Sequence, residues 1–450
     1  MAAAEIGAAR RESFRILNRV ERSGAFASRL LERLSGSALH RRDVRLATEL
    51  VLGTLRWRGR LDFVLARFSR RPLPDLHAGV RTALRLAAYQ ILFLDRVPES
   101  AAVNASVQLA RGCAGSGAAA FANAVLRALC RGRARIRLPS PDAPDPAGRE
   151  AAHSHPAWMI DRWKERLGWE ETRALLEANN RRAPVVLRPH GCAAAELSER
   201  LQAAGVETVP SPILPTCLRV RGGDPFQTPA FAAGDFYAQD ESSQMIPLLF
   251  GLPVPGPVLD LCAAPGGKAT QIAAAGPPFP LVIAADRNPA RLRRLLANRR
   301  RLRLERQMLL LGADFRRGSP FAGRFPAVLL DAPCTGTGTL RRHPEIRWRL
   351  RPEDPQAMAR VQAELLEAAA ERLEPGGVLV FSVCSLEPEE GRQGVESFLR
   401  GHPEFRLGDV RGFVPAGVHD LTTDGPYLAT FPHRGDLDGF FAARLERAPR

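Results

Sequence analysis

The spacing of apolar residues predicts helices in the first third of the chain. Between residues 8 and 131, apolar positions recur four residues apart, as at Ile16 and Val20, and this spacing is typical of one face of an α-helix. Arg81–Leu94 is a strongly apolar helical segment, and Ala118–Cys130 contains no Gly or Pro that would interrupt a helix. We therefore expect a small all-α bundle.

Past about residue 250, short apolar runs alternate with helical patterns. The runs are almost continuously apolar, which is typical of strands in a parallel sheet that is covered on both faces. The expected strands are Pro257–Cys262, Leu281–Asp286, Gln307–Leu311, Ala327–Asp331 and Val378–Val383. The expected helices between them are Lys268–Ala275, Pro289–Leu304 and Asp354–Leu373. This order predicts a doubly wound, Rossmann-like α/β domain.

The part between these regions begins with a proline-rich stretch. Leu138–Gly148 contains four prolines, which predicts a stiff, extended linker. A helical pattern over 150–180 is followed by the strand Pro184–Arg188, the helix Ala193–Ala204 and the strand Cys217–Arg221. We predict a multidomain chain: a helical domain at 1–138, a linker at 139–149, a small α+β module at 150–248 and the α/β domain at 249–450.

Positive charge is concentrated in the predicted helical domain. Residues 1–140 contain 25 Arg against 10 Asp and Glu, whereas the remainder has 39 basic and 38 acidic residues. Such an asymmetry favours binding of a polyanion such as nucleic acid. The alternative is an arginine-rich composition with solvated helix faces. Arg131, Arg133, Arg135 and Arg137 fit either interpretation.

The cysteines and the apolar runs indicate the cellular compartment in which the protein is expected. The seven cysteines are scattered and form no CxxC pair, which argues against a disulfide framework and against a zinc site. The N-terminus has no signal-peptide pattern, and no run reaches the roughly 18 apolar residues of a membrane helix. We expect a monomeric protein of the reducing cytoplasm, with no metal and no membrane partner.

Polar side chains stand at or just after the ends of the predicted strands. They are Asp260, Asp286, Asp314, Asp331 and Cys384. Ligands of an open α/β sheet bind outside the carboxyl ends of its strands. This coincidence predicts one active site at that edge.

A glycine-containing loop follows the first of these strands. It consists of Cys262, Ala263, Ala264, Pro265, Gly266, Gly267 and Lys268. The loop is neither GxGxxG nor a P-loop, but its glycines allow a ligand to approach a helix N-terminus. Asp286 lies 20 residues beyond Gly266, the spacing at which an acid binds ribose hydroxyls. We expect a ribose-bearing cofactor, with Asp314 near an adenine amino group.

Two thiols accompany these acids. Asp331-Ala-Pro-Cys334 places a carboxyl beside a thiol, and Cys384 ends the next strand. This pair suits nucleobase chemistry, because a thiolate that adds to C6 activates C5 of cytosine, and an acid at N3 stabilises the adduct. The chain has only two lysines, Lys164 and Lys268, so a lysine in the loop indicates a local requirement for an ammonium group.

These segments resemble the bacterial RNA 5-methylcytosine methyltransferases, and most closely the subfamily called RsmB or Sun/Fmu, which methylates 16S ribosomal RNA. The resemblance is carried by Leu259–Lys268, Asp331–Thr339 and Phe381–Glu390, and also by Arg341–Trp348 and Asp438–Arg444. The helical part is similar to the antitermination factor NusB family of RNA-binding bundles.

The resemblance implies S-adenosylmethionine as cofactor and 16S ribosomal RNA as partner. It implies that Cys262 to Lys268 line the cofactor site, that Asp286 binds the ribose and that Asp314 lies on the adenine side. It further implies that Asp331 faces cofactor and base, that Cys384 is the nucleophile, and that Cys334 assists product release. The family usually has Thr before the nucleophile, where this chain has Val383.

Three alternatives remain open at the level of sequence. The same chemistry can act on another RNA, such as tRNA. It can act on DNA, with Cys334 as nucleophile. The chain can also be a non-catalytic RNA-binding or antitermination protein whose α/β domain is inert.

Overall fold

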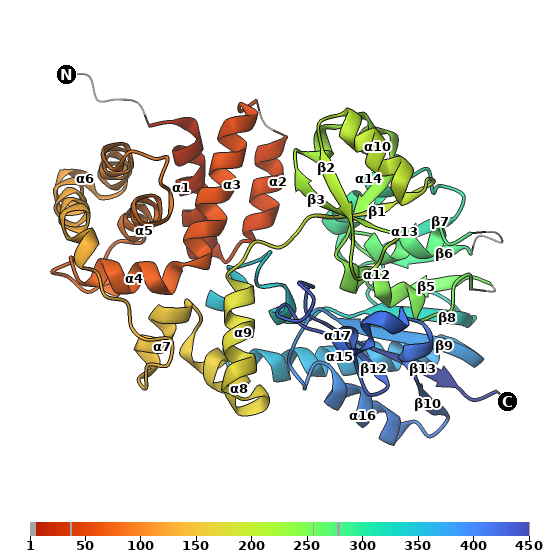
Figure 1. The fold of residues 1–450 in the computed structure, drawn as a ribbon. Coiled ribbons are helices and arrows are strands. Elements are labelled where there is room, and N and C mark those ends of the chain that lie inside the picture. The colour runs from red at the N-terminus through yellow and green to blue at the C-terminus, as the bar shows by residue number, and fades with distance from the viewer. Residues whose placement is uncertain (1–5, 37, 255, 277–279, 450) are drawn as a thin grey trace. The chain divides into compact units, whose positions relative to one another are not determined.

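The computed structural model describes residues 6–36, 38–254, 256–276 and 280–449, and Figure 1 shows its elements. The first five residues, where a leader pattern was sought, lie outside this range. The chain divides into two compact units. Unit 1 comprises Met1–Arg181 and Leu340–Pro352, and unit 2 comprises Arg182–Thr339 and Glu353–Arg450. The predicted domain boundaries at 138, 149 and 248 remain a proposal.

Unit 1 is built from helices, as the apolar spacing predicts. The helices are α1 (Ala8–Ser23), α2 (Ala27–Ser35), α3 (Arg41–Arg56), α4 (Arg58–Ala66), α5 (Ala78–Phe93), α6 (Glu99–Gly132), α7 (Pro146–His153), α8 (Ala157–Leu167) and α9 (Trp169–Asn179). Helix α5 is buried along most of its length, including Ala83, Leu84, Leu86 and Ala87. Because residues on all sides of this helix are buried, α5 forms the centre of the bundle.

Helix α6 contains the predicted helical segment Ala118–Cys130 but begins earlier, at Glu99. Its backbone is non-helical at Ala114 and Gly115, where Gly115 has a φ of 79°. By length and composition, Glu99–Arg135 is long and apolar enough to cross a membrane, a test that core helices also pass. Leu109 and Leu126 of this helix pack in the apolar core of unit 1.

The proline-rich stretch is extended only in part. Asp145 accepts a hydrogen bond from the backbone N–H of Gly148 at 2.6 Å and thereby caps α7. Pro146 occupies the first turn of this helix, a position where its missing N–H and fixed φ are no disadvantage. The last proline of the stretch therefore starts a helix, which the count of prolines alone did not predict.

The segment Leu340–Pro352 is anchored in unit 1 by buried hydrogen bonds. Arg347 is fully buried and donates to the carbonyls of Ser154 and Asn179, each at 3.1 Å, and to Oδ1 of Asn180 at 2.7 Å. The indole N–H of Trp348 donates to the carbonyl of Leu55 at 2.7 Å. A residue stretch from the second half of the chain thus completes the fold of unit 1.

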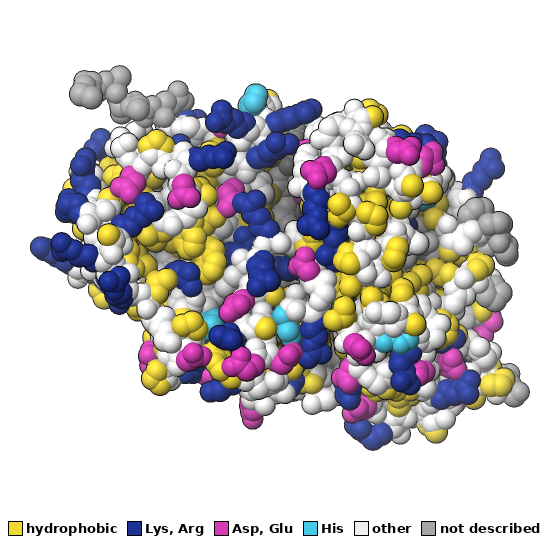
Figure 2. Space-filling view, in the orientation of Figure 1, with side chains coloured by type: hydrophobic (Ala, Val, Ile, Leu, Met, Phe, Trp, Pro, Cys, Tyr) yellow, Lys and Arg dark blue, Asp and Glu magenta, His cyan; other side chains and the backbone are white. Residues whose placement is uncertain are grey.

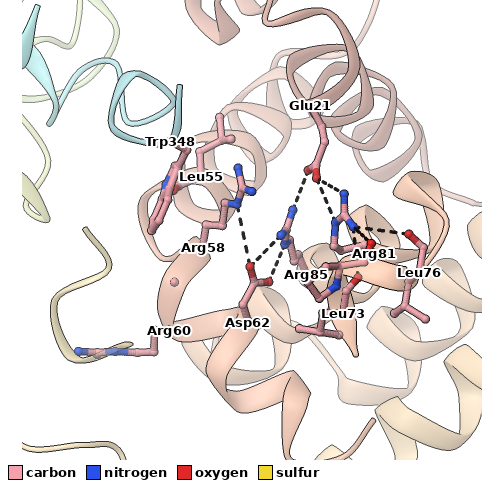
Figure 3. A network of polar contacts seen from close by, with 12 residues as sticks. Glu21, Leu55, Arg58, Arg60, Asp62, Leu73, Leu76, Arg81, Arg85 and Trp348 are labelled. Carbon is pink, nitrogen blue, oxygen red and sulfur yellow. Dashed lines mark hydrogen bonds and ion pairs between the residues drawn. The ribbon is translucent and has the colours of Figure 1, made fainter. Parts of the chain in front are cut away.

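A network of ion pairs lies inside the bundle, and Figure 3 shows it. Arg85 donates to Oε2 of Glu21 at 2.6 Å and, through two nitrogens, to both oxygens of Asp62 at 2.6 and 2.7 Å. Arg81 donates to the other oxygen of Glu21 at 2.7 Å. Only 6% of the Arg85 side chain is exposed, so its charge depends on these two carboxylates.

Unit 2 contains two sheets. The smaller sheet has the order β2-β3-β1-β4, with antiparallel pairing throughout. Its strands are β1 (Val186–Pro189), β2 (Glu207–Pro210), β3 (Leu218–Gly222) and β4 (Phe236–Ala238), and α10 (Ala194–Ala203) and α11 (Pro229–Ala233) belong to the same region. A small α+β module is predicted from the sequence, but the helical pattern over 150–180 that the prediction included lies in unit 1, as α7 to α9.

The larger sheet has the order β11-β12-β13-β9-β8-β5-β6-β7, and β10 pairs with β13. The strands are β5 (Val258–Asp260), β6 (Val282–Ala285), β7 (Met308–Leu311), β8 (Phe325–Asp331), β9 (Leu373–Val383), β10 (Phe405–Gly408), β11 (Thr423–Asp424), β12 (Tyr427–Thr430) and β13 (Phe440–Arg447). The helices of this region are α12 (Glu241–Leu248), α13 (Gly267–Ala273), α14 (Pro289–Arg301), α15 (Asp354–Glu371), α16 (Arg392–Gly401) and α17 (His419–Thr422).

The five expected strands, β5 to β9, form the parallel part of this sheet. Strand β8 shows why the run is continuously apolar: Ala327 and Leu329 pack in one core cluster, and Val328 and Leu330 pack in another. Alternate residues face opposite sides of a strand, so both faces of the sheet are covered. The antiparallel edge beyond β9 makes the sheet mixed, which the sequence interpretation did not include.

We predict that Arg85→Ala destabilises unit 1 by about 3 kcal/mol, because removing one partner leaves the other charges buried. This is the lower end of the range for buried pairs, since 30% of the Asp62 side chain is exposed. The five Trp residues all belong to unit 1, so denaturant unfolding followed by Trp fluorescence reports this unit.

The matched control is Arg133→Ala, which removes an ion pair to Glu99 that is 46% and 43% exposed. Exposed pairs contribute little, so this variant should stay within about 1 kcal/mol of the original protein. Equal losses in the two variants would contradict the role of burial.

Candidate active site at the carboxyl edge of the sheet

The parallel register brings the predicted site residues to one edge. Asp331, the last residue of β8, pairs with Ser382 of β9, and Asp260, the last residue of β5, lies opposite Leu329 of β8. A cavity of about 230 Å³ opens at this edge. Its lining includes Cys262, Asp286, Asp314, Asp331, Cys334 and Cys384.

The two thiols lie in contact. The Sγ atoms of Cys334 and Cys384 are 3.3 Å apart. Cys334 follows the end of β8 by three residues and Cys384 directly follows β9, so the pairing of these strands sets their distance. The hydrogen bond between the two thiols, together with burial, raises the pKa of Cys334 well above its ordinary value. Cys334 therefore keeps its proton at neutral pH.

Lys268 and Ser382 fix the carboxylate of Asp331. The Nζ atom of Lys268 lies 2.7 Å from Oδ2 of Asp331, and the hydroxyl of Ser382 donates to Oδ1 at 2.8 Å. Lys268 is only 7% exposed, and its ammonium also lies over the ring of Phe440. A compact ammonium group reaches this buried position from the first turn of α13. The structure thus gives a reason for a lysine in a chain that otherwise uses arginine.

Asp260 is the most buried acid of the edge. Its Oδ1 accepts a hydrogen bond from the backbone N–H of Cys262 at 3.2 Å, which supports the loop at its start. Burial, and next the charge of Asp331, raise the pKa of Asp260 to about 8. At neutral pH this carboxyl is therefore largely protonated.

Asp286 presents an oxygen that fits a ligand hydroxyl. Its Oδ1 accepts from the N–H of Asn288 at 2.8 Å. Its Oδ2 is buried, has no hydrogen-bond partner, and lies 3.5 Å from Nε of Arg291. A buried carboxylate oxygen without a donor is costly. The hydroxyl groups of a ribose would supply the missing donors.

Asp314 is engaged by arginines. Arg316 hydrogen-bonds to Asp314 at 3.2 Å, and this bond lowers the pKa of the Asp314 carboxyl. Arg287 lies 3.8 Å away. Asp314 lines the cavity, but its contact with an adenine amino group stays a prediction.

The glycine loop is shaped by close packing. Gly266 has a φ of +109°, and a Cβ there would lie 2.3 Å from Cδ1 of Leu295, so this position requires glycine. Within the loop, the carbonyl of Ala264 accepts from Arg291 and that of Pro265 accepts from Asn298. Cys262 lines the cavity. Lys268 contacts Asp331, which is also part of the lining.

Three arginines of the cavity were not identified from the sequence. Arg287, Arg291 and Arg316 line it together with the acids. Lysine and arginine total 64 in this chain, and only two of these are lysine. No single arginine stands out against that composition, so only the fold reveals them.

Comparison with known proteins agrees with this architecture. Residues 255–446 match a family described as 16S rRNA methyltransferase RsmB/F, residues 7–131 match the NusB family, and residues 155–227 match the ferredoxin-like domain of RsmF/B-like methyltransferases. The "Probable ribosomal RNA small subunit methyltransferase B" of Synechocystis is 32% identical and aligns over 98% of this chain and 99% of its own length. The chain belongs to the RsmB/F family of S-adenosylmethionine-dependent methyltransferases.

Other RsmB/F relatives and solved structures match over most of the chain. The ribosomal RNA small subunit methyltransferase B of Yersinia pseudotuberculosis is 32% identical over 90% of both chains. The crystal structure of PH0851 covers 97% of this chain with a TM-score of 0.80 and 28% identity. A methyltransferase homologue from Pyrococcus horikoshii covers 68% of the chain and 99% of its own, with a TM-score of 0.56 and 26% identity.

We predict that Asp260→Asn changes the pH dependence of stability. The folded protein holds the Asp260 proton up to about pH 8, whereas the unfolded chain releases it near pH 4. Between these values the folded state binds the extra proton, so the free energy of unfolding falls as pH rises. The free energy of unfolding of the variant does not fall in this way. Relative to the original protein, it should therefore rise by on the order of 1 kcal/mol per pH unit.

Calorimetry at about pH 5 and about pH 7.5 measures this difference. The relevant transition is the unfolding of unit 2, which contains no Trp. The control is Asp409→Asn, because Arg411 lowers the pKa of Asp409 to about 2 and this carboxyl is ionised throughout the range. If the free energies of unfolding of Asp260→Asn and the original protein differ by the same amount at both pH values, the pKa of Asp260 is not raised.

Proposed function

We propose that this chain transfers a methyl group to carbon 5 of a cytosine in RNA, through a covalent bond between Cys384 and C6 of that base. The observation that supports this most directly is the contact of two thiols, 3.3 Å apart, beside a fixed carboxylate in a cavity. One thiol is needed to form the adduct. The second, which keeps its proton, is suited to its breakdown.

In the proposed reaction, a base takes the proton from Sγ of Cys384, and the thiolate adds to C6 of cytosine, which raises the electron density at C5. S-adenosylmethionine would supply the methyl group: C5 bonds to it while the bond from the methyl to the sulfonium sulfur breaks, which leaves S-adenosylhomocysteine. A base then removes the proton from C5, the C5–C6 double bond re-forms, and the bond between Sγ and C6 breaks. Cys334 lies in contact with the departing sulfur and assists this last step.

Asp331 is proposed to contact N3 of the cytosine. In the adduct N3 can carry a proton, and a carboxylate at this position stabilises it by accepting a hydrogen bond from that N3–H. Lys268 and Ser382 each hold one oxygen of Asp331, so the group is oriented before the base arrives. Such preorganised polar groups stabilise developing charge without reorganisation.

The cofactor is proposed to lie along the loop and the strand ends. Residues Cys262 to Lys268 would follow its backbone, Asp286 would bind the ribose, and Asp314 would lie on the adenine side. The buried oxygen of Asp286 that lacks a donor supports the ribose position. Asp331 would face both cofactor and base.

We further propose 16S ribosomal RNA as the substrate. Two relatives that align over 99% and 90% of their own length, from Synechocystis and Yersinia pseudotuberculosis, are named as probable or assigned ribosomal RNA small subunit methyltransferase B. We expect the protein to act as a monomer in the cytoplasm. Another RNA, such as tRNA, is the alternative substrate for the same chemistry.

Unit 1 is proposed to bind the phosphate backbone of the RNA. Arg127, Arg131, Arg133, Arg135 and Arg137 are all exposed at the end of α6 and just beyond it. Figure 2 shows many Lys and Arg side chains over the face of unit 1 that is turned to the viewer. Neutralising phosphates releases counterions, so such binding weakens with salt.

We predict that Cys384→Ala abolishes formation of 5-methylcytidine, because no other group would activate C5. Labelled S-adenosylmethionine, unmodified 16S RNA and nucleoside analysis measure this. Cys334→Ala should instead accumulate a covalent complex between protein and RNA, visible on a denaturing gel, because release is impaired.

Full turnover by Cys384→Ala would rule out the proposed nucleophile. An adduct on 5-fluorocytosine DNA that is lost only in Cys334→Ala would favour the DNA reaction. If the protein binds the RNA but transfers no label, a different RNA is tested next, followed by calorimetry of cofactor binding. Failure to bind the cofactor would favour a non-catalytic RNA-binding protein.

We predict that replacing the four arginines after α6 flattens the salt dependence of RNA binding. Each phosphate contact contributes roughly 0.7 to 0.9 to the slope of log affinity against log salt, so losing four contacts lowers it by about 3. Filter binding at several salt concentrations measures this slope. The substitutions are Arg131→Gln, Arg133→Gln, Arg135→Gln and Arg137→Gln.

The control changes the net charge equally on unit 2. It replaces Arg293, Arg300, Arg303 and Arg306 by Gln; all four side chains are exposed. An unchanged slope in the unit 1 variant, or the same decrease in both variants, would refute a specific phosphate contact at the end of α6. Point variants are preferred to a deletion of 1–138, because Leu55 and other residues of that region anchor the segment 340–352.

A further inference from the structure

Glu390 is a buried carboxylate that accepts four hydrogen bonds. It lies between β9 and α16, and its exposure is 0%. One oxygen accepts from the backbone N–H of Thr335 at 2.8 Å and from Nε2 of Gln362 at 3.0 Å. The other accepts from the hydroxyl of Ser385 at 2.6 Å and from the hydroxyl of Thr335.

Two of the three residues that donate to Glu390 are direct chain neighbours of the two thiols. Thr335 follows Cys334 in the chain, and Ser385 follows Cys384. A single side chain is therefore hydrogen-bonded to both loops that carry the cysteines. Gln362, from α15, also donates to the carbonyl of Pro333 at 2.9 Å. Both chain neighbours of Cys334, Pro333 and Thr335, are therefore fixed by hydrogen bonds.

Further hydrogen bonds join the same two loops. The N–H of Leu386 donates to the hydroxyl of Thr337 at 2.9 Å, and the N–H of Gly338 donates to the carbonyl of Cys384 at 3.1 Å. The hydroxyl of Ser385 lies 3.2 Å from those of Thr335 and Thr337. Glu390 accepts from both loops at the centre of this network.

A carboxylate in such a position is energetically demanding. Burial raises the pKa of Glu390 above its ordinary value, and the hydrogen bonds from Ser385, Thr335 and Gln362 oppose this rise in part. A buried charge is tolerated only where hydrogen bonds compensate the lost hydration. The four donors must therefore keep their places, which makes the arrangement rigid.

We propose that Glu390 is a positioning residue. It holds Cys334 close enough to Cys384 to assist release of the methylated base from the covalent adduct. The inference rests on the proposed function, because it concerns the breakdown of the Cys384 adduct with help from Cys334. Without the carboxylate, the two loops would be joined by neutral hydrogen bonds only. The thiols would then spend less time in contact, and release would slow more than addition.

The first test measures how closely the thiols are held, without any RNA. Phenylarsine oxide binds two neighbouring thiols at once: two As–S bonds form, and the oxygen leaves as water with the two thiol protons. Its affinity reports the effective concentration of one thiol beside the other. Cys334→Ser gives the affinity for single thiols.

We predict that Glu390→Gln weakens binding of the arsenical at least about tenfold, because charge-assisted hydrogen bonds are lost and an amide N–H faces two donors. The matched control is Glu241→Gln. Glu241 is also 0% exposed in unit 2 and accepts from Ser211 at 2.9 Å and Arg219 at 2.5 Å, but neither partner adjoins Cys334 or Cys384. The control should bind the arsenical like the original protein.

Thr335 supplies a milder pair of variants in case Glu390→Gln does not fold. Thr335→Ser keeps the hydroxyl bonded to Glu390 and should bind the arsenical normally. Thr335→Val removes this hydroxyl at nearly constant volume and should weaken binding. Equal affinities for Thr335→Val and the original protein, or for Glu390→Gln and the original protein, would overturn the proposal.

The second test uses methyl transfer to 16S RNA. Glu390→Gln should lower kcat at unchanged KM for RNA and cofactor, and it should accumulate the covalent complex as Cys334→Ala does. Weakened arsenical binding with an unchanged kcat would also overturn the proposal. If the original protein forms no 5-methylcytidine, the proposed function fails, while the arsenical test still decides whether Glu390 holds the thiols.

Discussion

The parallel pairing of β8 with β9 is the constraint on which the site depends. Asp331 lies opposite Ser382, so the loops that carry Cys334 and Cys384 start at neighbouring positions on the edge of the sheet. Side chains of a strand alternate between its faces, and a shift of one residue would exchange every one of them. The apolar residues of β8 face two different core clusters, and exchanging them would disrupt both. The packing of the sheet thereby sets the distance between two sulfur atoms beyond its edge.

Buried charge is compensated in different ways in the two units. In unit 1, Arg85 is bonded to two carboxylates, and the surplus of arginine lies on the surface. In unit 2, Asp331 has an ammonium partner, Asp260 has a raised pKa, and Glu390 is bonded to hydroxyl, amide and backbone donors. The carboxyl groups near the site are thus accommodated in different ways because their surroundings differ. The charge of Asp331 helps to raise the pKa of Asp260, and the proton that Asp260 retains reduces the repulsion between them.

Much of the fold follows from the sequence because the apolar pattern is strong where burial is complete. The runs that became β5 to β9 were identifiable for this reason, and so was the bundle around α5. The antiparallel strands at the edge of the larger sheet were not, since the Phe440–Arg447 segment mixes charges with apolar residues, and Thr423–Asp424 is too short for a pattern. At the site, strand ends and spacing indicated both thiols and the acids. The bonds of Lys268 and Glu390 depend on the path of the loops, which local pattern does not encode.

The anchoring of residues 340–352 in unit 1 bears on the order of events during synthesis. A chain emerging from the ribosome presents α1 to α9 long before Arg347 and Trp348 exist. Until then, the carbonyls of Leu55, Ser154 and Asn179 lack the donors that they have in the finished protein. Domains generally fold in the order in which they are made. Here the first unit reaches its final form only after strands β1 to β8 of the second have been translated.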